Sequence, residues 1–143
     1  MKIVVKIGGK AIEDKATLQK CAHAVVELAH DGHQIAVVHG GGSTLTRTLQ
    51  LLGKKSDFVD GLRITDAETR DVALMVLAGM VNKGVVAAIV AAGVPAVGLC
   101  GGDGMTFRAR KKQTKGYDLG FVGEICSVEP RWLDAIWGQG GIP

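Results

Sequence analysis

The sequence has few of the residues that cross-link or stiffen small proteins, with 3 cysteines and 3 prolines among 143 residues. Cys21, Cys100 and Cys126 are odd in number and far apart, so neither a disulfide framework nor a cysteine metal site is predicted. His30 and His33 are closely spaced but have no third ligand, and we predict no metal site there either. Reduced thiols of this kind are typical of a cytoplasmic protein.

The sequence also has little net charge and no evident targeting segment. Its formal net charge of +3 is too small to indicate a nucleic-acid partner by itself. The basic run from Arg108 to Lys115 is interpreted as a solvated loop or hairpin, with an anion-attracting surface as the alternative. Met1 to Val5 lacks the long apolar core of a signal peptide, and no stretch is predicted to span a membrane. We therefore expect a cytoplasmic protein that binds neither nucleic acid nor membrane.

Apolar residues and glycine are abundant. The composition is 47% hydrophobic and 22% charged, which is typical of a globular protein, and residues 1–143 suffice for one domain. The 21 glycines cluster in short runs after apolar stretches rather than in a linker-like spread. Because glycine lets the backbone come close to a ligand, this placement indicates binding turns.

Apolar runs alternate with helical patterns in the first third of the chain. Strands are predicted at Lys2 to Ile7 and at Gln34 to Val38. Helices are predicted from about Asp14 to His30 and from a Ser43 cap to a Gly53 stop. This alternation predicts an α/β fold, a three-layer αβα sandwich with a mainly parallel sheet.

The middle of the chain is predicted to be helical and unusually apolar. Thr65 and Glu68 have the spacing of a capping box, with Thr65 as the cap. The stretch from Val72 to Met80 has too few polar positions for a solvent face, so we expect a partner chain to cover it. The elements predicted after it are a helix at about Lys83 to Ala92, a strand at Pro95 to Leu99, a hairpin of Met105 to Arg110 with Gly120 to Val128, and a helix entered at Pro130 that buries Trp132 and Trp137.

Two glycine turns are the strongest indication of chemistry. Gly8-Gly9 follows the first predicted strand, and Gly40 to Gly42 follows the second. In an open α/β sheet, ligands bind beyond the carboxyl ends of the strands, where backbone N–H groups receive carboxylate or phosphate. Lys6 stands just before the first turn, where its charge can serve the same ligand; the alternative is a lysine on an exposed strand edge. No dinucleotide fingerprint and no P-loop are present.

Six short motifs together cover essentially the whole chain: Lys6-Ile7-Gly8-Gly9, His39-Gly40-Gly41-Gly42, Gly61-Leu62-Arg63-Ile64-Thr65, Val81-Asn82-Lys83, Gly98 to Gly104, and Gly120-Phe121-Val122-Gly123. Their order and approximate spacing resemble those of the amino-acid kinase family. Through the second and third of these motifs, the sequence is most similar to the acetylglutamate kinases of that family.

The resemblance implies a role for each matching residue. Lys6 would stabilise the transferring phosphoryl group, and Gly8 and Gly9 would bind the ATP phosphates. Gly41 and Gly42 would hold the reacting carboxylate of N-acetyl-L-glutamate. Arg63 would bind the α-carboxylate with its planar guanidinium.

The resemblance also implies structural residues and cofactors. His39 and Asn82 are expected to be structural, with His39 fixing the glycine turn by hydrogen bonding, and Asp103 is expected in a turn. The implied reaction is the ATP- and Mg²⁺-dependent phosphorylation of N-acetyl-L-glutamate in arginine biosynthesis. The implied assembly is a homodimer, because the chain begins on its first strand without the extra helix of arginine-regulated relatives.

The motifs of the family's ATP-binding half are not found, so the chain is expected to be a substrate-binding part that ends before that half and is inactive alone. Two other readings remain open. One is a kinase for an acetylated or carrier-linked aminoadipate in lysine biosynthesis. The other is a binding or sensor domain without catalysis.

Overall fold

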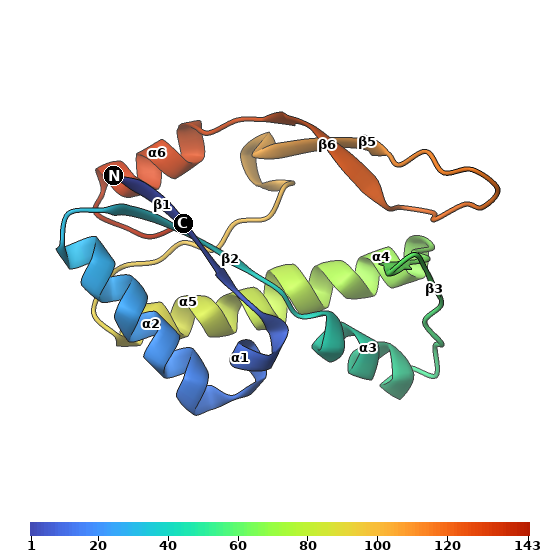
Figure 1. Cartoon of the computed structure of the whole chain (residues 1–143), viewed down its shortest axis with the longest axis horizontal. Helices are drawn as coiled ribbons and strands as arrows, with labels where there is room; N and C mark the ends of the chain where they lie inside the picture. The colour runs from blue at the N-terminus through green and yellow to red at the C-terminus, as the bar shows by residue number, and fades with distance from the viewer.

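The computed structural model describes residues 1–143, and its centre is a parallel strand pair covered by helices (Figure 1). β1 (Lys2–Ile7) pairs with β2 (Gln34–His39) in parallel, in a register running from Lys2 opposite Gln34 to Ile7 opposite His39. Between them lie α1 (Gly9–Glu13) and α2 (Lys15–His30). Both strands were predicted, whereas α1 was not. The α/β expectation is confirmed.

The main core lies between the strand pair and two helices, α2 and α5 (Asn82–Ala91), which run below the strands in Figure 1. Every second strand residue points to this side, as strand geometry requires, and Ile7 and Ile35 are almost fully buried there. Val25 of α2 and Ile89 of α5 meet them. The opposite face carries α6 (Arg131–Gly138), which completes the third layer.

A second, smaller core joins α3 (Gly42–Leu51) to a long helical rod. The rod consists of α4 (Ala67–Ala73), a π-helical stretch (Leu74–Val81) and α5, without a break between them. Leu49 of α3 is fully buried against Val72 and Val76 of this rod. The two predicted helices are therefore one continuous element.

The rod bears on the expectation that no stretch spans a membrane. Its 25 residues from Ala67 to Ala91 are long and apolar enough to cross one by length and composition alone. The core helix of a globular domain passes the same test, and the buried face of this rod belongs to the two cores. The finding is weak evidence for a membrane span.

Helix starts differ from the expected caps. α3 begins at Gly42 with Gly41 as its cap, not at Ser43. α4 is capped by Asp66, whose carboxylate accepts from the Thr69 N–H at 2.8 Å, not by Thr65. The Thr65 hydroxyl instead donates to the Arg63 carbonyl at 2.9 Å, which turns it away from the helix.

The predicted third strand is only a single bridge. Ala96 pairs in parallel with Ile142, and no other residue of Pro95 to Leu99 belongs to a ladder. The bridge rests on two hydrogen bonds, from the Ile142 N–H to the Pro95 carbonyl and from the Val97 N–H to the Ile142 carbonyl. Pro143 also accepts from Val37 of β2 at 2.9 Å, so this short segment stands between the two flanking strands.

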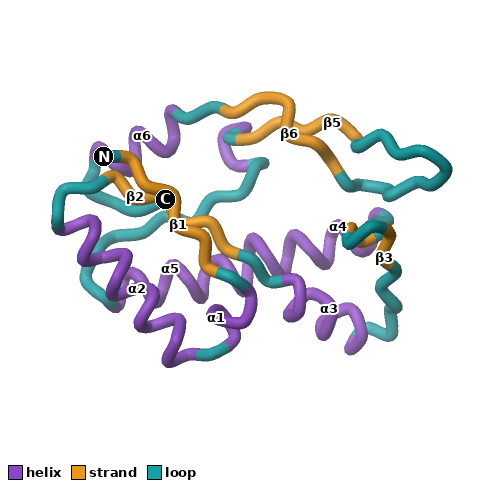
Figure 2. The backbone as a smooth tube through the Cα atoms, viewed as in Figure 1, coloured by secondary structure: helices purple, strands orange, loops and turns teal.

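Two antiparallel hairpins lie outside the parallel strand pair (Figure 2). β3 (Phe58–Val59) and β4 (Leu62–Arg63) form a small one, which was not predicted. β5 (Phe107–Lys111) and β6 (Gly123–Val128) form the predicted long one, which reaches over the first and pairs Gly120 with Thr65.

The expectation that the two tryptophans lie in the core is wrong. α6 has no fully buried residue. Trp132 is 43% exposed and donates to the Gly104 carbonyl, while Trp137 is half-buried and donates to the Ile35 carbonyl. Both indole rings need a partner for their N–H, and both find it in a backbone carbonyl.

Candidate functional site

The two glycine turns meet at the carboxyl edge of the strand pair. The Gly40 N–H donates to the Ile7 carbonyl at 3.0 Å, which extends the parallel ladder into the turns. A Cβ added at Gly40 would lie 3.4 Å from the Gly9 nitrogen, so the two backbones are in contact. Behind the turns begin α1 and α3, whose first-turn N–H groups have no acceptor within the helix. The edge therefore presents donors and the positive ends of two helix dipoles.

Gly41 is the residue of this edge that cannot carry a side chain. Its φ is +149°, and a Cβ there would lie 2.7 Å from the Leu77 Cδ2 of the π-helical stretch. Gly42 is different, since a Cβ there would meet nothing within 4 Å. The π-helical stretch supports Gly41 from behind, and open space lies over Gly42.

A hydrogen-bonded chain from α5 fixes the second turn. His39 Nδ1 lies 2.9 Å from the Gly40 carbonyl, which can only accept, so Nδ1 carries the proton. His39 Nε2 then accepts from the Asn82 amide at 3.2 Å, and Asn82 Oδ1 accepts from Lys83 at 3.0 Å. The expectation that His39 holds the turn by hydrogen bonding is confirmed.

Arg63 lies beside the start of α3 on the β3–β4 hairpin. Its guanidinium donates to the Thr46 hydroxyl at 2.8 Å, to the Gly42 carbonyl at 3.5 Å and to the Ser56 hydroxyl. The Phe58 ring stacks on it at 4.6 Å. Partial burial lowers the pKa of Arg63, and the three polar contacts keep the guanidinium in one orientation.

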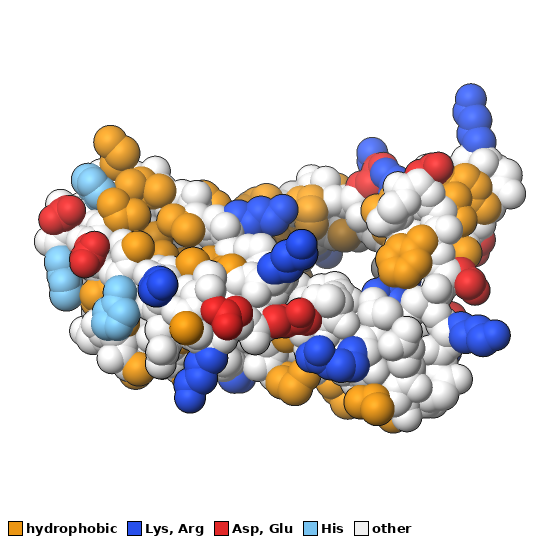
Figure 3. Space-filling view, turned by 60° about the horizontal axis from the view of Figure 1, so that its bottom comes forward, with side chains coloured by type: hydrophobic (Ala, Val, Ile, Leu, Met, Phe, Trp, Pro, Cys, Tyr) orange, Lys and Arg blue, Asp and Glu red, His pale blue; other side chains and the backbone are white.

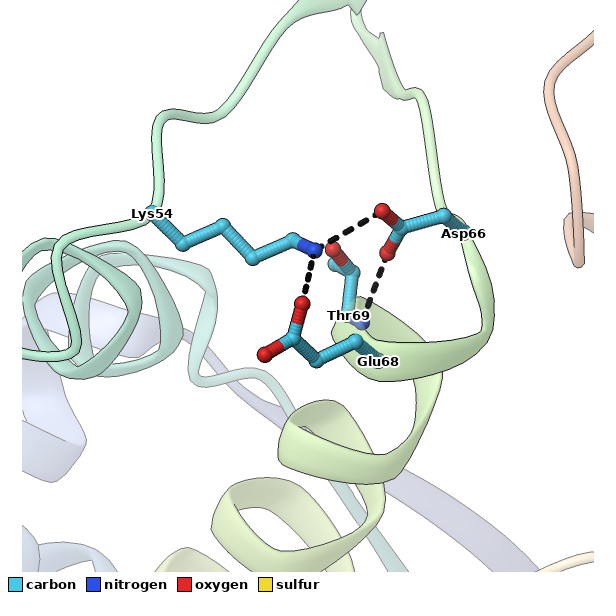
Figure 4. A network of polar contacts seen from close by, with 4 residues as sticks. All are labelled: Lys54, Asp66, Glu68 and Thr69. Atoms are coloured by element: carbon cyan, nitrogen blue, oxygen red, sulfur yellow. Dashed lines mark hydrogen bonds and ion pairs between the residues drawn. The ribbon is translucent and has the colours of Figure 1, made fainter.

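A charged cluster joins the two ends of the segment from residue 54 to residue 66, which carries Arg63 (Figure 4). Lys54 stands at its start and donates to Asp66 at 2.7 Å and to Glu68 at 2.6 Å at its end. The hydrogen bond from Lys54 lowers the pKa of Asp66 strongly, and the hydrogen bonds that Lys54 donates to Asp66 and Glu68 raise the pKa of Lys54. We call Lys54, Asp66 and Glu68 the Lys54 clamp. Glu68 thus pairs with Lys54 instead of closing a capping box.

Glu13 links the two turns from below, and no sequence pattern pointed to it. It accepts from the Thr44 hydroxyl at 3.1 Å, tying α1 to α3. Hydrogen bonds from Ser43 and then Thr44 lower the pKa of Glu13, so it is held as a carboxylate. Thr46, Ser56 and Phe58 were also missed as partners of Arg63. For the β3–β4 hairpin, the sequence did contain a signal, because Asp-Gly pairs are typical of two-residue hairpin turns. Asp60 and Gly61 form this turn, and both have positive φ.

The remaining candidate residues are placed as follows. Lys6 is exposed at the end of β1 and forms no ion pair within the chain. Asp103 accepts from the Cys100 N–H at 2.7 Å, which confirms it as a turn residue, and this bond lowers the pKa of Asp103. No three His, Cys, Asp or Glu side chains lie together as metal ligands. On the face shown in Figure 3, basic and acidic side chains are interspersed rather than gathered in one patch.

The model of the amino acid kinase family matches residues 1–141. The chain belongs to the amino acid kinase family.

The most similar relatives include proteins named acetylglutamate kinase. The one from Acidobacterium capsulatum is 61% identical over 143 residues, covering 100% of this chain and 55% of the relative. The one from Koribacter versatilis is 53% identical, covering 100% of this chain and 54% of the relative. The chain therefore spans about half the length of the curated relatives it matches.

Solved structures agree on the fold. N-acetylglutamate synthase from Neisseria gonorrhoeae, in complex with coenzyme A and N-acetyl-glutamate, superposes with a TM-score of 0.78 at 26% identity, over 99% of this chain and 33% of that one. The smu.665 protein of Streptococcus mutans superposes with a TM-score of 0.84 at 24% identity, over 99% of this chain and 56% of that one. The amino-acid kinase-like α/β fold is thereby confirmed.

Proposed function

We propose that residues 1–143 are the substrate-binding domain of an acetylglutamate kinase, which phosphorylates the side-chain carboxylate of N-acetyl-L-glutamate with ATP. The observation that carries the proposal is the meeting of the two glycine turns at one sheet edge, with Arg63 oriented beside them. The names of the relatives at 61% and 53% identity support the substrate.

The two ends of the substrate fit the two parts of the site. The open space over Gly42 and the free N–H groups of the first turn of α3 suit the reacting carboxylate. The α-carboxylate is assigned to Arg63, whose Nε–H has no partner within the chain. The donors for each carboxylate are thus already in place before the substrate binds.

The ATP phosphates are assigned to the first turn. Gly8 is exposed, and a Cβ on it would meet nothing within 4 Å, so an anion has room to approach the N–H groups that begin α1. When bound, ATP supplies the phosphoryl group, and Mg²⁺ would neutralise its charge. The residues present do not fit a metal site of their own, so this chain contributes no metal ligand set.

The chemistry then requires positive charge and fixed dipoles rather than a strong base. A carboxylate oxygen is already a competent nucleophile, so no proton must be removed before it bonds to phosphorus. Bringing it against a triphosphate costs electrostatic energy, which Lys6 and the turn N–H groups offset. The whole assembly would act in the cytoplasm as a homodimer, completed by an ATP-binding half.

Calorimetry with N-acetyl-L-glutamate tests this assignment. Arg63→Ala removes charge-assisted hydrogen bonds worth roughly 1.5–3 kcal/mol each, so at least about a tenfold loss of affinity is expected. Arg63→Lys should recover little, because an ammonium keeps the charge but loses the planar fork. Arg131→Ala, in an exposed arginine of α6 that stacks on Trp132, is the matched control. Unchanged affinity in Arg63→Ala would overturn the site.

A further inference from the structure

A lysine at the start of α5 is connected to the second glycine turn by side-chain hydrogen bonds that the proposed function does not use. Lys83 is exposed, and it donates to Asn82 Oδ1 at 3.0 Å and to the Gly98 carbonyl at 3.3 Å. It forms no ion pair within the chain, so no direct carboxylate partner neutralises its charge. We call Lys83, Asn82 and His39 the Lys83 relay.

All hydrogen bonds of the Lys83 relay run in the same direction. Asn82 accepts from Lys83 with its oxygen and donates from its nitrogen to His39 Nε2 at 3.2 Å. His39 then donates from Nδ1 to the Gly40 carbonyl at 2.9 Å. The two ends fix this direction, because an ammonium group can only donate and a carbonyl can only accept. Hydrogen bonds linked in this way polarise one another, so the cation strengthens each of them.

The middle member of the relay is held in place by packing. The Asn82 side chain is buried, and a Cβ on Gly98 would overlap its Oδ1 atom. Glycine at position 98 therefore leaves the space that the amide group occupies. This gives a physical reason for the glycine that opens the motif from Gly98 to Gly104, to which the proposed function assigns no role.

The relay ends on a peptide group with an unused donor. The Gly40 carbonyl and the Gly41 N–H belong to one peptide unit, and resonance couples them, so a hydrogen bond to the carbonyl makes the N–H a stronger donor. The Gly41 N–H donates to no group within the chain. Its nitrogen lies 3.9 Å from the position that a Cβ on Gly9 would take. The donor therefore lies where the two glycine turns meet, within reach of an anion bound between them.

We propose that Lys83 is a positioning residue of the candidate site, which acts through Asn82 and His39 to strengthen the Gly41 N–H as a donor to a bound carboxylate or phosphoryl oxygen. Two side chains separate Lys83 from the turn, so its contribution is electrostatic and involves no contact with the ligand. The inference deepens the proposed function and rests on it for the identity of the anion. The relay itself is present in the chain without a ligand.

Nuclear magnetic resonance of the ligand-free chain tests the relay directly. In the ¹⁵N-labelled chain, the His39 ring should be the neutral tautomer with its proton on Nδ1. In Lys83→Met, the Gly41 amide proton should shift upfield, because the polarisation of its peptide group is weaker. Lys83→Arg retains the cation and should stay near the parent value. Lys20→Met is the matched control, since it removes an exposed lysine of α2 that forms no ion pair.

A second variant separates the relay from the charge itself. Gly98→Ala keeps Lys83 but displaces the Asn82 amide, so it should shift the Gly41 amide proton upfield as Lys83→Met does. If Gly98→Ala does not fold, the comparison of Lys83→Met with Lys83→Arg and Lys20→Met still decides, because these changes lie on the surface.

Calorimetry with N-acetyl-L-glutamate measures the consequence for binding. Lys83→Met should weaken binding about three- to tenfold, whereas Lys83→Arg and Lys20→Met should change it less than about twofold. Added salt should reduce the loss in Lys83→Met, because ions screen an exposed charge.

Three outcomes would overturn the inference. The first is a His39 proton on Nε2 instead of Nδ1. The second is a Gly41 shift and an affinity in Lys83→Met that equal those of Lys20→Met. The third is parent values in a folded Gly98→Ala variant, which would show that the charge acts without the relay. A Gly41 shift that follows Lys83 in a chain without N-acetyl-L-glutamate affinity would support the relay and contradict the proposed function, so the two can fail separately.

Discussion

At the scale of single residues, the neighbouring glycines Gly41 and Gly42 have different roles. Gly41 combines a φ of +149° with a Cβ position 2.7 Å from Leu77, so any side chain there is strained twice. Gly42 has open space where its Cβ would be. The same residue type thus serves packing at one position and ligand approach at the next.

This contrast gives a paired prediction. Gly41→Ala should lower the free energy of unfolding by roughly 1–3 kcal/mol, because both the backbone and the Leu77 contact resist the methyl group. Gly42→Ala should leave the stability within about 0.5 kcal/mol, yet reduce N-acetyl-L-glutamate affinity, because the methyl group occupies the approach to the turn. Urea unfolding and calorimetry measure the two effects. Equal losses of stability in both variants would contradict the assignment.

The motif residues were predictable one by one, whereas their partners were not. Gly41, Arg63 and His39 stand in short motifs that local sequence reveals. Thr46 and Ser56 reach Arg63 from 17 and 7 residues away, across a turn whose path the sequence does not specify. The supporting residues of the site are therefore set by tertiary packing, which sequence periodicity does not predict.

At the scale of elements, the strands and the long helices were predicted because their apolar spacing is regular. The rod from Ala67 to Ala91 was divided in two because it is apolar on several sides, which hides its period, and its π-helical turns shift the face further. The cap at Asp66 was missed because Thr65 is an equally good cap by local rules. Tertiary pairing excludes Thr65 as the cap, because its N–H donates to the Leu119 carbonyl in the bridge to the β5–β6 hairpin.

The Lys54 clamp should set the order of the segment that carries Arg63. Lys54→Met should increase hydrogen exchange at positions 55–65 about two- to fivefold and weaken substrate binding in parallel, and added salt should reduce the difference. Lys55→Met, a change at an exposed neighbour without an ion pair, is the control. No difference in exchange between the two variants would show that the clamp does not order the segment.

The clamp also has a predictable pH dependence. The pKa of Asp66 is depressed in the folded chain, so its contribution is present above the ordinary carboxyl value near 3.8 and is lost as pH falls through the lower folded value. The pKa of Lys54 is raised from 10.5, so its contribution is present below that value and is lost as pH rises through the folded one. Exchange at positions 55–65 should therefore change at these two extremes, and Asp66→Asn should remove the acid limb.

At the scale of the whole molecule, the solvent-facing side of the rod carries large exposed apolar side chains. Leu74, Met75 and Met80 are 58%, 63% and 59% exposed on one helix, although these side chains gain most from burial. The rod's other face is already taken by the two cores, so nothing within the chain can cover them. A second copy related by a two-fold axis is the simplest closed arrangement that covers such a patch.

We therefore expect the chain to be a homodimer through this surface. Met75→Asp should shift it to a monomer in sedimentation equilibrium at micromolar concentration, because a charge buried at the centre of an apolar interface finds no partner. Val90→Asp is the control, since Val90 is 50% exposed on the same rod but lies about four turns away. A monomeric parent chain at that concentration, or a dimer that tolerates Met75→Asp as readily as Val90→Asp, would place the interface elsewhere and leave the apolar stripe for another partner.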